Sequence, residues 1–471
     1  MLVSQLFSGA DISREIKDKE IKNITDNSQN CCEGSIFVCH NSGERYVEEA
    51  LRKGAVLVVA EKKVCDNCIV TDDTAAQYAR LCAEFHSSRH KNLKLIAVTG
   101  TNGKTTTANM LYTILTLSGK KCGLIGTVKS NICGKERESS LSTPDPFEMH
   151  RMFSELYDWG AEYCIVEASS QGICEGRLSG LEFYLGIMTN ISRDHLDYHG
   201  TMENYVDAKK SLFGLCEKAV INADDEYCEE FISECKGKVI TYSSDKNEAD
   251  YVAKSIKLSE NGSDYAVIAD YAIHRVRLNI PGQFNIMNSL AAVAAARECN
   301  VSLEYCAYAL KSFSGVRGRM EILDIAAEYK VVIDYAHTPD AMKKVLLCLN
   351  SFPHERIITV FGCGGGRDRE KRAMMGDIAS QLSDVLVVTS DNPRGEEPME
   401  IIDGIISGIK KGKKAVYIHE NRRKAIEYAL KIASKNDIIL LAGKGHEAYQ
   451  LIGTEKLPMD ERTIVREILG K

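Results

Sequence analysis

A glycine-rich turn between a strand pattern and a helix pattern is the stretch of the chain most suited to chemistry. A run of apolar, β-favouring residues leads into Gly100-Thr-Asn-Gly-Lys-Thr-Thr106, after which a helical pattern begins. Gly100 and Gly103 allow backbone N–H groups to close on an anion, and the start of the helix adds a favourable dipole. Lys104 can reach the β- and γ-phosphates of a nucleotide, and the Thr105 hydroxyl can hold Mg²⁺. The stretch therefore predicts an ATP site.

This loop is shorter than the common phosphate-binding loop, because only two residues separate its glycines where four are usual. A tight strand-to-helix turn without a ligand is the alternative interpretation. Gly-Lys-Thr-Thr at a strand-to-helix junction is a demanding combination, however, and it favours the nucleotide site.

Two further clusters of polar residues follow predicted strands. Glu167 ends a strand pattern, and the stretch from Asn190 to Gly200 places two carboxylates and two imidazoles within six residues, from Asp194 to His199. Chemistry in a parallel sheet gathers beyond the carboxyl ends of the strands, so both clusters should face the glycine-rich loop. A carboxylate there suits a hard cation such as Mg²⁺. The alternatives are a solvated Glu and a polar loop or helix cap.

The surrounding pattern divides the chain into three α/β segments, at 1–88, 89–318 and 319–471. The first alternates short strands with helices and carries no catalytic constellation of its own. The second holds the glycine-rich loop in a parallel sheet and changes, between 250 and 280, to alternating strands with an Asn261-Gly262 turn, which predicts an antiparallel insertion. The third restarts a strand–helix rhythm and predicts a Rossmann-like α/β domain.

A second glycine-rich turn, Gly362-Cys-Gly-Gly-Gly366, follows a predicted strand of the third segment. It does not match the dinucleotide-binding fingerprint, because the third glycine of that fingerprint would fall at Arg367. We therefore reject NAD as a cofactor.

Composition limits the remaining classes of protein. The net charge of −7 is spread along 471 residues and gives no footprint for nucleic acid or an anionic membrane. No apolar run approaches the ~20 residues that a membrane-spanning helix needs, and the N-terminus lacks the basic start and apolar core of a signal peptide. We therefore expect a cytoplasmic protein in which the 17 cysteines are reduced and mostly buried.

The short loop and the stretch after Asn190 together resemble the Mur ligases. Asn-x-Ser-x-Asp-His-Leu-Asp-x-His-Gly, followed by Tyr-x-x-Ala-Lys ending at Lys209, matches that family in order and spacing. The resemblance implies that Glu167 and His195 ligate magnesium and that Lys209 is carbamylated and binds a second Mg²⁺. It also implies four catalytic residues: Lys104, Glu167, His195 and Lys209. An unmodified Lys209 on a solvated helix face is the alternative.

The resemblance extends to the substrates. It implies a small uridine-binding domain at the N-terminus, where the turn containing Ser28 lacks the Arg that the family has next. ATP would be bound by Gly100, Thr101, Asn102, Gly103, Lys104, Thr105, Thr106, Asn285 and Arg319. UDP-MurNAc-dipeptide would be bound by Ser28, Ser142, Thr143, Ser169, Ser170, Arg177 and Lys209. Magnesium would be held by Thr105, Glu167, His195 and the Lys209 carbamate.

The third segment indicates the amino-acid substrate. In this family Asp-Asn-Pro-Arg, present here at Asp391 to Arg394, is typical of the ligases that use meso-diaminopimelate. Arg394 can pair with the carboxylate beside the distal amine of diaminopimelate, which lysine lacks. The resemblance implies binding by Arg367, Asp391, Asn392, Pro393, Arg394, Gly443 and Glu447. An Asn-Pro turn with a surface Arg is the alternative.

The implied activity is ATP-dependent addition of meso-diaminopimelate to the D-glutamyl γ-carboxylate of UDP-MurNAc-L-Ala-D-Glu through an acyl phosphate, in peptidoglycan precursor synthesis. We expect a monomer that needs ATP and Mg²⁺. A ligase that uses L-lysine or another amino acid is the nearest alternative. Folylpolyglutamate synthetase is disfavoured, because it needs neither a uridine domain nor the Asp391–Arg394 motif. A phosphate-loop protein that hydrolyses ATP as a switch is the alternative from another class.

Overall fold

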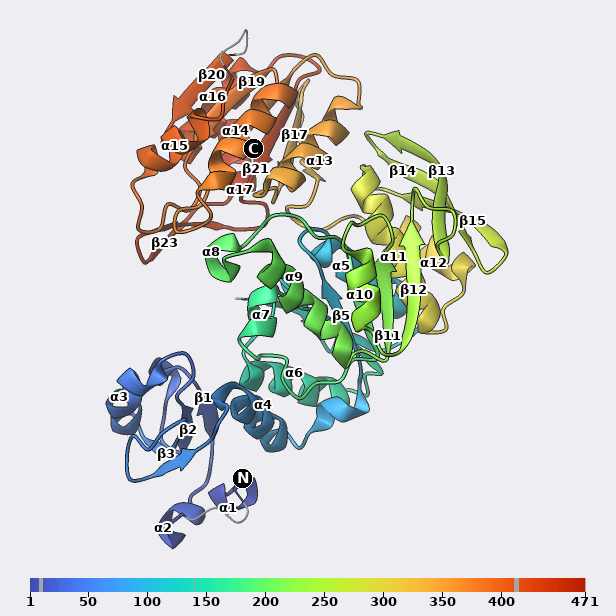
Figure 1. The fold of residues 1–471 in the computed structure, drawn as a ribbon. Coiled ribbons are helices and arrows are strands. Elements are labelled where there is room, and N and C mark those ends of the chain that lie inside the picture. The colour runs from blue at the N-terminus through green and yellow to red at the C-terminus, as the bar shows by residue number, and fades with distance from the viewer. Residues whose placement is uncertain (8–11, 140, 411–414, 471) are drawn as a thin grey trace.

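Three α/β units follow one another in space as they do in the sequence (Figure 1). The structure is a computed structural model that describes residues 1–7, 12–139, 141–410 and 415–470. The units are built on sheets of four, eleven and six strands, and a separate two-stranded hairpin lies in the last unit. The predicted α/β class with mainly parallel sheets is confirmed.

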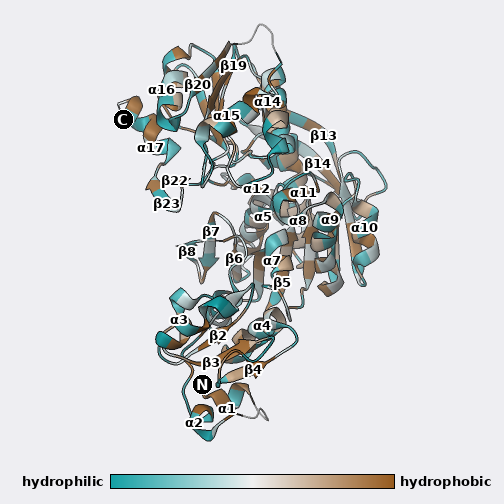
Figure 2. Cartoon of the chain, turned by 60° about the vertical axis from the view of Figure 1, so that its left-hand side comes forward, coloured by the Kyte–Doolittle hydropathy of each residue, from teal (hydrophilic) through white to brown (hydrophobic). Residues whose placement is uncertain are grey.

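The first unit contains a four-stranded parallel sheet in the order β1-β2-β3-β4. Its strands are β1 (Asn23–Thr25), β2 (Ser35–Val38), β3 (Ala55–Ala60) and β4 (Cys68–Val70). Its helices are α1 (Val3–Leu6), α2 (Arg14–Lys17), α3 (Val47–Arg52) and α4 (Thr74–Phe85). The apolar residues gather in the strands, as the brown colour of β2 and β3 shows in Figure 2.

The central unit places the glycine-rich loop in the middle of its sheet, because β5 lies between β10 and β9. The strands of the parallel part are β5 (Lys94–Thr99), β6 (Cys122–Ile125), β9 (Tyr163–Glu167), β10 (Leu185–Met188), β11 (Lys218–Asn222) and β12 (Lys238–Ser243). The helices are α5 (Lys104–Leu117), α6 (Pro146–Asp158), α7 (Ser170–Cys174), α8 (Leu196–His199), α9 (Met202–Lys210), α10 (Cys228–Glu234), α11 (Gln283–Glu298) and α12 (Leu303–Lys311). An apolar core beneath the loop joins α5 to the Ala-rich α11.

Antiparallel strands extend both edges of this sheet. One edge ends in β7 (Lys129–Ile132) and β8 (Lys135–Glu138), and the other in β13 (Tyr251–Ser259), β14 (Gly262–Ala269) and β15 (Ala272–Leu278). The turn at Asn261-Gly262 joins β13 to β14, as predicted. The strands β13, β14 and β15 are continuous with the main sheet, because β13 pairs in parallel with β12.

The last unit has a six-stranded sheet in the order β16-β17-β21-β18-β19-β20. Its strands are β16 (Glu321–Ile322), β17 (Lys330–Asp334), β18 (Ile357–Phe361), β19 (Val385–Thr389), β20 (Ala415–His419) and β21 (Ile438–Ala442), and β22 (Tyr449–Ile452) and β23 (Glu455–Pro458) form the hairpin. Its helices are α13 (Pro339–Asn350), α14 (Glu370–Leu382), α15 (Pro398–Ile406), α16 (Arg422–Ile432) and α17 (Glu461–Ile468). The prediction of a helix after each of the strands β17, β18, β19 and β20 is confirmed.

The 17 cysteines are free thiols, most of them buried. Within the described ranges, the structure contains no helix long and apolar enough to cross a bilayer.

The junction between the first two units contains a cluster of histidines. The rings of His90 and His150 lie 4.8 Å apart between centroids, and both side chains are buried. Burial, with the charge of Lys91, lowers the pKa of His90 to about 4. Burial, with the neighbouring His90 and His86, lowers the pKa of His150 to about 3. Both rings are therefore neutral in the folded protein near pH 7.

We expect thermal stability to fall as pH drops from about 6.5 towards 4. The unfolded chain binds protons on these histidines near their ordinary value of 6.5, so acid favours unfolding, at about 1.4 kcal/mol for each unit of pKa difference. The variant His150→Phe removes one such group and should flatten the loss of Tm by a few °C between pH 7 and 4.5. A scan of Tm against pH measures this, and a slope equal to wild type would contradict it.

Candidate active site

The glycine-rich loop joins β5 to α5 in a conformation that only glycine tolerates at two positions. Gly100 has φ of 139° and Gly103 has φ of 88°. A Cβ at Gly100 would lie 2.0 Å from Thr189 Oγ1, and one at Gly103 would lie 2.3 Å from Asn288 Oδ1. Any side chain at either position would displace the loop from the neighbouring polar residues.

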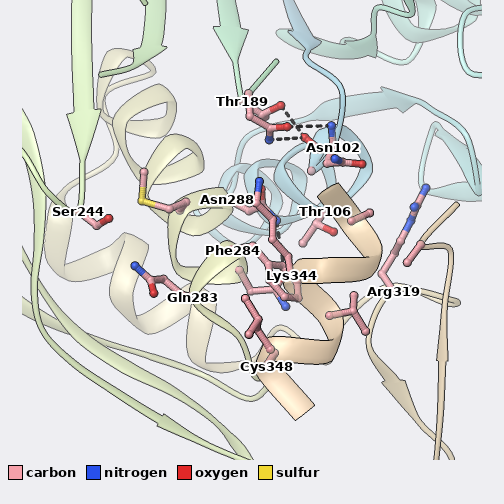
Figure 3. A pocket seen from close by; sticks show the side chains of 18 of the residues that line it. Asn102, Thr106, Thr189, Ser244, Gln283, Phe284, Asn288, Arg319, Lys344 and Cys348 are labelled. Atoms are coloured by element: carbon pink, nitrogen blue, oxygen red, sulfur yellow. Dashed lines mark hydrogen bonds between the residues drawn. The ribbon is translucent and has the colours of Figure 1, made fainter. Parts of the chain in front are cut away.

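Asn190, at the end of β10, fixes the shape of this loop. Its Oδ1 accepts a hydrogen bond from Asn102 N at 3.1 Å, and its Nδ2 donates to Asn102 O at 2.9 Å. The hydroxyl of Thr189 donates to the same Asn102 oxygen at 2.7 Å (Figure 3). The predicted proximity of this strand end to the loop is therefore found.

The Nζ atoms of two lysines converge on one carbonyl of the loop. Lys104 Nζ donates to Gly100 O at 2.8 Å and Lys209 Nζ donates to the same oxygen at 2.9 Å. Burial lowers the pKa of Lys104, although Glu167 and Asp194 oppose the shift. Burial, together with Lys104, lowers the pKa of Lys209 well below its ordinary value. The positive charge of Lys104 lies where a phosphate or carboxylate would be stabilised.

Glu167 is fully buried at the end of β9 and directly contacts the loop helix. Its Oε2 accepts hydrogen bonds from Thr105 Oγ1 at 2.8 Å and Thr127 Oγ1 at 2.7 Å, and its Oε1 accepts one from Thr127 N at 3.0 Å. Thr105 and Glu167, both predicted magnesium ligands, are therefore neighbours. The hydroxyl and carboxylate oxygens are the donor types that Mg²⁺ prefers.

Asp194 lies between two imidazoles. Its Oδ2 is 3.3 Å from His195 Nε2 and 3.6 Å from His337 Nε2, which belongs to the last unit. Burial alone would raise the pKa of Asp194, but the hydrogen bond from His337 and the charge of Lys371 hold the pKa of this carboxyl well below its usual range. Asp194 therefore remains an anion that joins the two units.

His195 has the properties expected of a metal ligand. Burial lowers its pKa to about 4 against the attraction of Asp194, so the ring is neutral near pH 7. Its Nδ1 is buried and finds no hydrogen-bond partner among the described residues. The described ranges contain no group of three or more His, Cys, Asp or Glu side chains arranged to hold a metal ion. A cation here would need the Thr105 hydroxyl, or oxygens from a substrate or a modified lysine, in addition to Glu167 and His195.

A cavity of about 470 Å³ lies between the loop, α11 and α13, and we call it the central cavity. Of the residues predicted to bind ATP, those that line it are Asn102, Gly103, Thr106, Asn285 and Arg319. Figure 3 shows Asn102 and Thr106 on the loop side and Lys344 and Cys348 on α13. Lys344 and Phe284 also line it, and no motif in the sequence indicated them. The arrangement suits a nucleotide whose phosphates lie on the loop.

Arg319 connects the central cavity to the loop. Its Nη2 donates a hydrogen bond to Thr105 Oγ1 at 3.4 Å. Its guanidinium stacks over the ring of Tyr335, 4.4 Å from the centroid. Gly318, just before it, has φ of 71°, and a Cβ there would lie 2.2 Å from Gly445 C. The backbone between the central and last units is therefore packed tightly beside the site.

Most residues predicted to bind the UDP substrate form one patch beside Glu167. Thr143 Oγ1 donates to Glu167 O at 2.8 Å and accepts from Ser169 N at 3.0 Å, and Arg177 Nη1 donates to Thr143 O at 2.8 Å. The Ser142 hydroxyl lies 2.8 Å from Thr127 Oγ1, within hydrogen-bonding distance. The Ser170 hydroxyl lies 2.9 Å from His199 Nε2.

Ser28 does not join this patch. It lies in the first unit, in a short 3-10 turn (Ser28–Asn30), and donates to Glu49 Oε2 at 2.8 Å. The remaining predicted contact with UDP-MurNAc-dipeptide, Lys209, lies in α9 and donates to Gly100 O of the loop at 2.9 Å.

The two motifs of the last unit meet at one place. Asn392 Nδ2 donates to Glu447 Oε2 at 2.9 Å. Lys444, which is fully buried, donates to Asn392 Oδ1 at 2.7 Å and to Glu447 Oε2 at 2.5 Å. Gly443 has φ of 108°, and a Cβ there would lie 2.7 Å from Asp391 Oδ2. Sequence reasoning missed Lys444, although it lies within the motif that contains Gly443 and Glu447.

Arg394 follows Pro393, which is buried, and has φ of 53°. Its Nη1 donates to Gly365 O at 2.8 Å, in the second glycine-rich turn. Arg367, predicted for the same substrate, instead reaches the central unit, where its Nη1 lies 3.3 Å from Asp197 Oδ2. The structure thus brings Arg394 and the second glycine-rich turn together and leaves Arg367 on the interface.

The last unit lies against the loop through charged contacts. Arg193 pairs with Asp368 at 2.9 Å and with Glu370 at 2.7 Å, both in the last unit. Asn102 Nδ2, in the loop itself, donates to Asp340 Oδ2 at 3.0 Å. These contacts place the motifs of the last unit over the same edge of the central sheet as the lysines and Glu167.

Comparison with known proteins gives consistent matches over nearly the whole chain. Residues 98–296 match the family model of the Mur ligase middle domain, and residues 318–445 match that of the Mur ligase, glutamate ligase domain. The UDP-N-acetylmuramoyl-L-alanyl-D-glutamate–2,6-diaminopimelate ligase 1 of Clostridium acetobutylicum is 40% identical over 460 residues, covering 96% of this chain and 95% of that protein. The corresponding ligase of Clostridium perfringens is 37% identical, covering 100% and 99%.

Solved structures give a parallel result. A structure of a UDP-N-acetylmuramoyl-L-alanyl-D-glutamate–2,6-diaminopimelate ligase has a TM-score of 0.69 at 30% identity and covers 100% of this chain and 99% of its own. A MurF ligase from Thermotoga maritima in complex with ADP shares the fold at 21% identity, with a TM-score of 0.66 and coverage of 90% and 95%.

Proposed function

Because this chain belongs to the Mur ligase family, we propose that it is the ATP-dependent ligase that adds meso-diaminopimelate to UDP-MurNAc-L-Ala-D-Glu. The observation that carries the choice of amino acid is the pairing of the two motifs of the last unit, in which Asn392 and Glu447 lie within hydrogen-bonding distance beside Arg394. An acidic and a basic group are thus available for an amino acid that carries both an amine and a carboxylate at its distal end.

The residues of the loop support the first half of the reaction. Arg319, which lines the central cavity, and Lys104, at the start of α5, would bind the phosphates of ATP. The patch around Thr143 and Arg177 would hold the D-glutamyl end of the UDP substrate next to Glu167. Proximity of the two anionic substrates favours transfer of the γ-phosphoryl group to the carboxylate, which gives an acyl phosphate.

Thr105, Glu167 and His195 would hold Mg²⁺, and a carbamate on Lys209 would hold a second ion. Bound magnesium would neutralise charge between the two anionic substrates. Lys209 lies close to the same loop carbonyl as Lys104, so a carboxylated form would remain beside the phosphates.

The second half of the reaction would be attack of the amine of diaminopimelate on the carbonyl carbon of the acyl phosphate, which forms the amide bond and expels inorganic phosphate. Arg394 would pair with the distal carboxylate and Glu447 with the distal ammonium, which directs the other amine to the reacting carbon. The contacts of Arg193 and Asp194 with the last unit would keep water from the acyl phosphate while the units are together.

The three α/β units would be the three domains at 1–88, 89–318 and 319–471, with the uridine of the substrate on the first, near Ser28. We further propose that the protein is a cytoplasmic monomer. A ligase of the same family that uses L-lysine is the second candidate, and a switch that hydrolyses ATP is the third.

The test is ATP-dependent phosphate release with UDP-MurNAc-L-Ala-D-Glu and either meso-diaminopimelate or L-lysine. We expect release to need diaminopimelate. The variant Arg394→Ala should raise KM for diaminopimelate about tenfold to a hundredfold, because a charged pair is lost, while L-lysine remains a poor substrate.

The variant Arg423→Ala is the matched control. Arg423 lies in the same unit and pairs with Glu467 on the surface, where its loss should leave KM unchanged. Equal release with lysine in the wild-type enzyme would favour the second candidate. Release that is independent of any amino acid would favour the switch.

A further inference from the structure

The two loops proposed to bind diaminopimelate leave the last sheet from strands that are not neighbours. We call residues 391–394, after β19, and residues 443–447, after β21, the two site loops. In the sheet, β18 lies between β19 and β21, so no backbone pairing joins the ends of these two strands. The pairing of the sheet therefore does not fix the distance between the two loops.

Arg422 makes that connection. It is the first residue of α16, and its side chain is fully buried. Its Nη2 donates to Ala442 O at 2.7 Å, and its Nη1 donates to Ser390 O at 3.3 Å. These carbonyls belong to the residues immediately before the two site loops. One rigid guanidinium therefore binds the backbone immediately before each of the two site loops.

Glu461 fixes the orientation of this guanidinium. It is the first residue of α17 and is also fully buried. Its Oε1 accepts the hydrogen bond of Arg422 Nε at 2.8 Å. An arginine in a protein interior remains charged, so the Glu461 carboxylate balances a charge that would otherwise be buried alone. Nη2 also lies 2.8 Å from this Glu461 oxygen, so Nη1 and the second hydrogen of Nη2 are left to reach the two carbonyls.

Beyond those carbonyls the site loops contact each other directly. Lys444 in one loop donates to Asn392 Oδ1 in the other at 2.7 Å, and Leu451 N donates to the same oxygen at 2.9 Å. A shift of Ser390 relative to Ala442 would therefore change the geometry of Asn392 and Glu447. The effect on the reaction would come through these residues, because Arg422 is buried behind them.

We propose that Arg422, oriented by Glu461, is a positioning residue that sets the separation of the two site loops and thereby the affinity for the amino-acid substrate. The proposal rests on the proposed function for the identity of that substrate. The positions of the carbonyls and of the buried ion pair do not depend on it.

The variant Arg422→Lys tests this proposal. A lysine keeps the positive charge beside Glu461, but its compact ammonium lacks the planar fork that reaches two carbonyls together. We expect KM for diaminopimelate to rise at least tenfold. KM for ATP and for UDP-MurNAc-L-Ala-D-Glu should stay within twofold of wild type, because neither Arg422 nor the two site loops line the central cavity and the patch around Thr143 lies on the central unit.

Arg356→Lys is the matched control at the opposite end of the same sheet. Arg356 lies just before β18 begins. It pairs with the buried Asp437 at 2.6 Å and donates to Ile432 O at 2.9 Å. This substitution removes the same kind of fork from an ion pair in the same unit, but far from the site loops. It should leave all three KM values unchanged. Equal changes in the two variants would overturn the proposal, since a general loss of stability would then explain them.

Hydrogen exchange provides a measurement that needs no turnover. In Arg422→Lys the amides of both site loops should exchange at least threefold faster than in wild type, and Arg356→Lys should leave them unchanged. Unchanged exchange in the loops of Arg422→Lys would overturn the proposal even if KM rose. Faster exchange in both loops would support the positioning role even if the wild-type enzyme failed to use diaminopimelate, a result that would overturn only the proposed function.

Discussion

The variant Lys104→Met is expected to lower kcat by about 10³-fold, because one preorganised positive charge at the transferring phosphoryl group is lost. Methionine retains an unbranched apolar stem and so keeps the packing of the first turn of α5. In the structure the ammonium of Lys104 donates to the carbonyls of Gly100 and Thr101, at 2.8 and 3.0 Å. In the ligand-free protein this charge contacts only neutral carbonyls among the described residues, so it is available to bind an anionic substrate. Steady-state phosphate release with all substrates saturating measures the effect.

The same substitution should not lower the stability of the ligand-free protein. Burial lowers the pKa of Lys104, which means that the folded protein holds its charged form at a cost. Loss of this ammonium should therefore leave Tm equal to or above that of wild type, while the increase in Tm that ATP produces should shrink. Lys120→Met, beyond the other end of α5, is the control and should change neither kcat nor the ATP effect. Retention of more than a tenth of the wild-type kcat in Lys104→Met would contradict the assigned role.

Local sequence patterns were sufficient for the loop and its surroundings. Glycines at 100 and 103 are required by positive φ and by neighbouring side chains that would lie within 2.3 Å of any added Cβ, so their spacing carries structural information by itself. Glu167 and Asn190 could be assigned to the same edge because parallel strands end their carboxyl sides together. Those inferences depend on strand ends, which apolar runs mark well.

Contacts between units could not be predicted in the same way. The resemblance to the Mur ligases implied that Arg367 binds the amino-acid substrate, and in the structure it lies beside Asp197, 170 residues away in the sequence. Nothing in the local pattern of either residue indicates the other, because the approach of two units depends on the packing of whole domains. The same holds for the pair of Asp194 and His337.

Buried charged side chains also could not be predicted from the sequence. Arg422 lies in the basic run Arg422-Arg423-Lys424 at the start of an amphipathic helix, a pattern that is typical of a solvated face. Its neighbour Arg423 is indeed on the surface, half-exposed, whereas Arg422 is fully buried. The difference comes from Glu461, which is 39 residues further along the chain and whose packing against α16 no periodicity reveals. Lys444 was also missed, because no pattern in the sequence around it indicates that its side chain is buried.

The variant Lys209→Ala is expected to lower kcat by about 10³-fold, comparable to the effect at Lys104. Only an unprotonated amine reacts with carbon dioxide, and burial holds the pKa of Lys209 well below its ordinary value, with Lys104 adding to the shift. The lowered pKa therefore makes the form that can be carbamylated more accessible than it is for an exposed lysine. We accordingly expect wild-type activity to fall in buffers stripped of carbon dioxide and to return when bicarbonate is added. Phosphate release under both conditions is the measurement.

The adjacent Lys210 separates modification from general loss of charge. It lies on the same helix, pairs with Asp207 at 2.7 Å on the solvent side, and has a raised pKa, chiefly through the hydrogen bond to Asp207. Lys210→Ala should keep kcat and the response to bicarbonate. Lys209→Glu places a permanent carboxylate near the same carbonyl and should be insensitive to carbon dioxide, with more activity than Lys209→Ala. If wild-type activity were independent of carbon dioxide while Lys209→Ala remained inactive, Lys209 would act as an amine, and its charge beside Lys104 would bind the substrate anion directly.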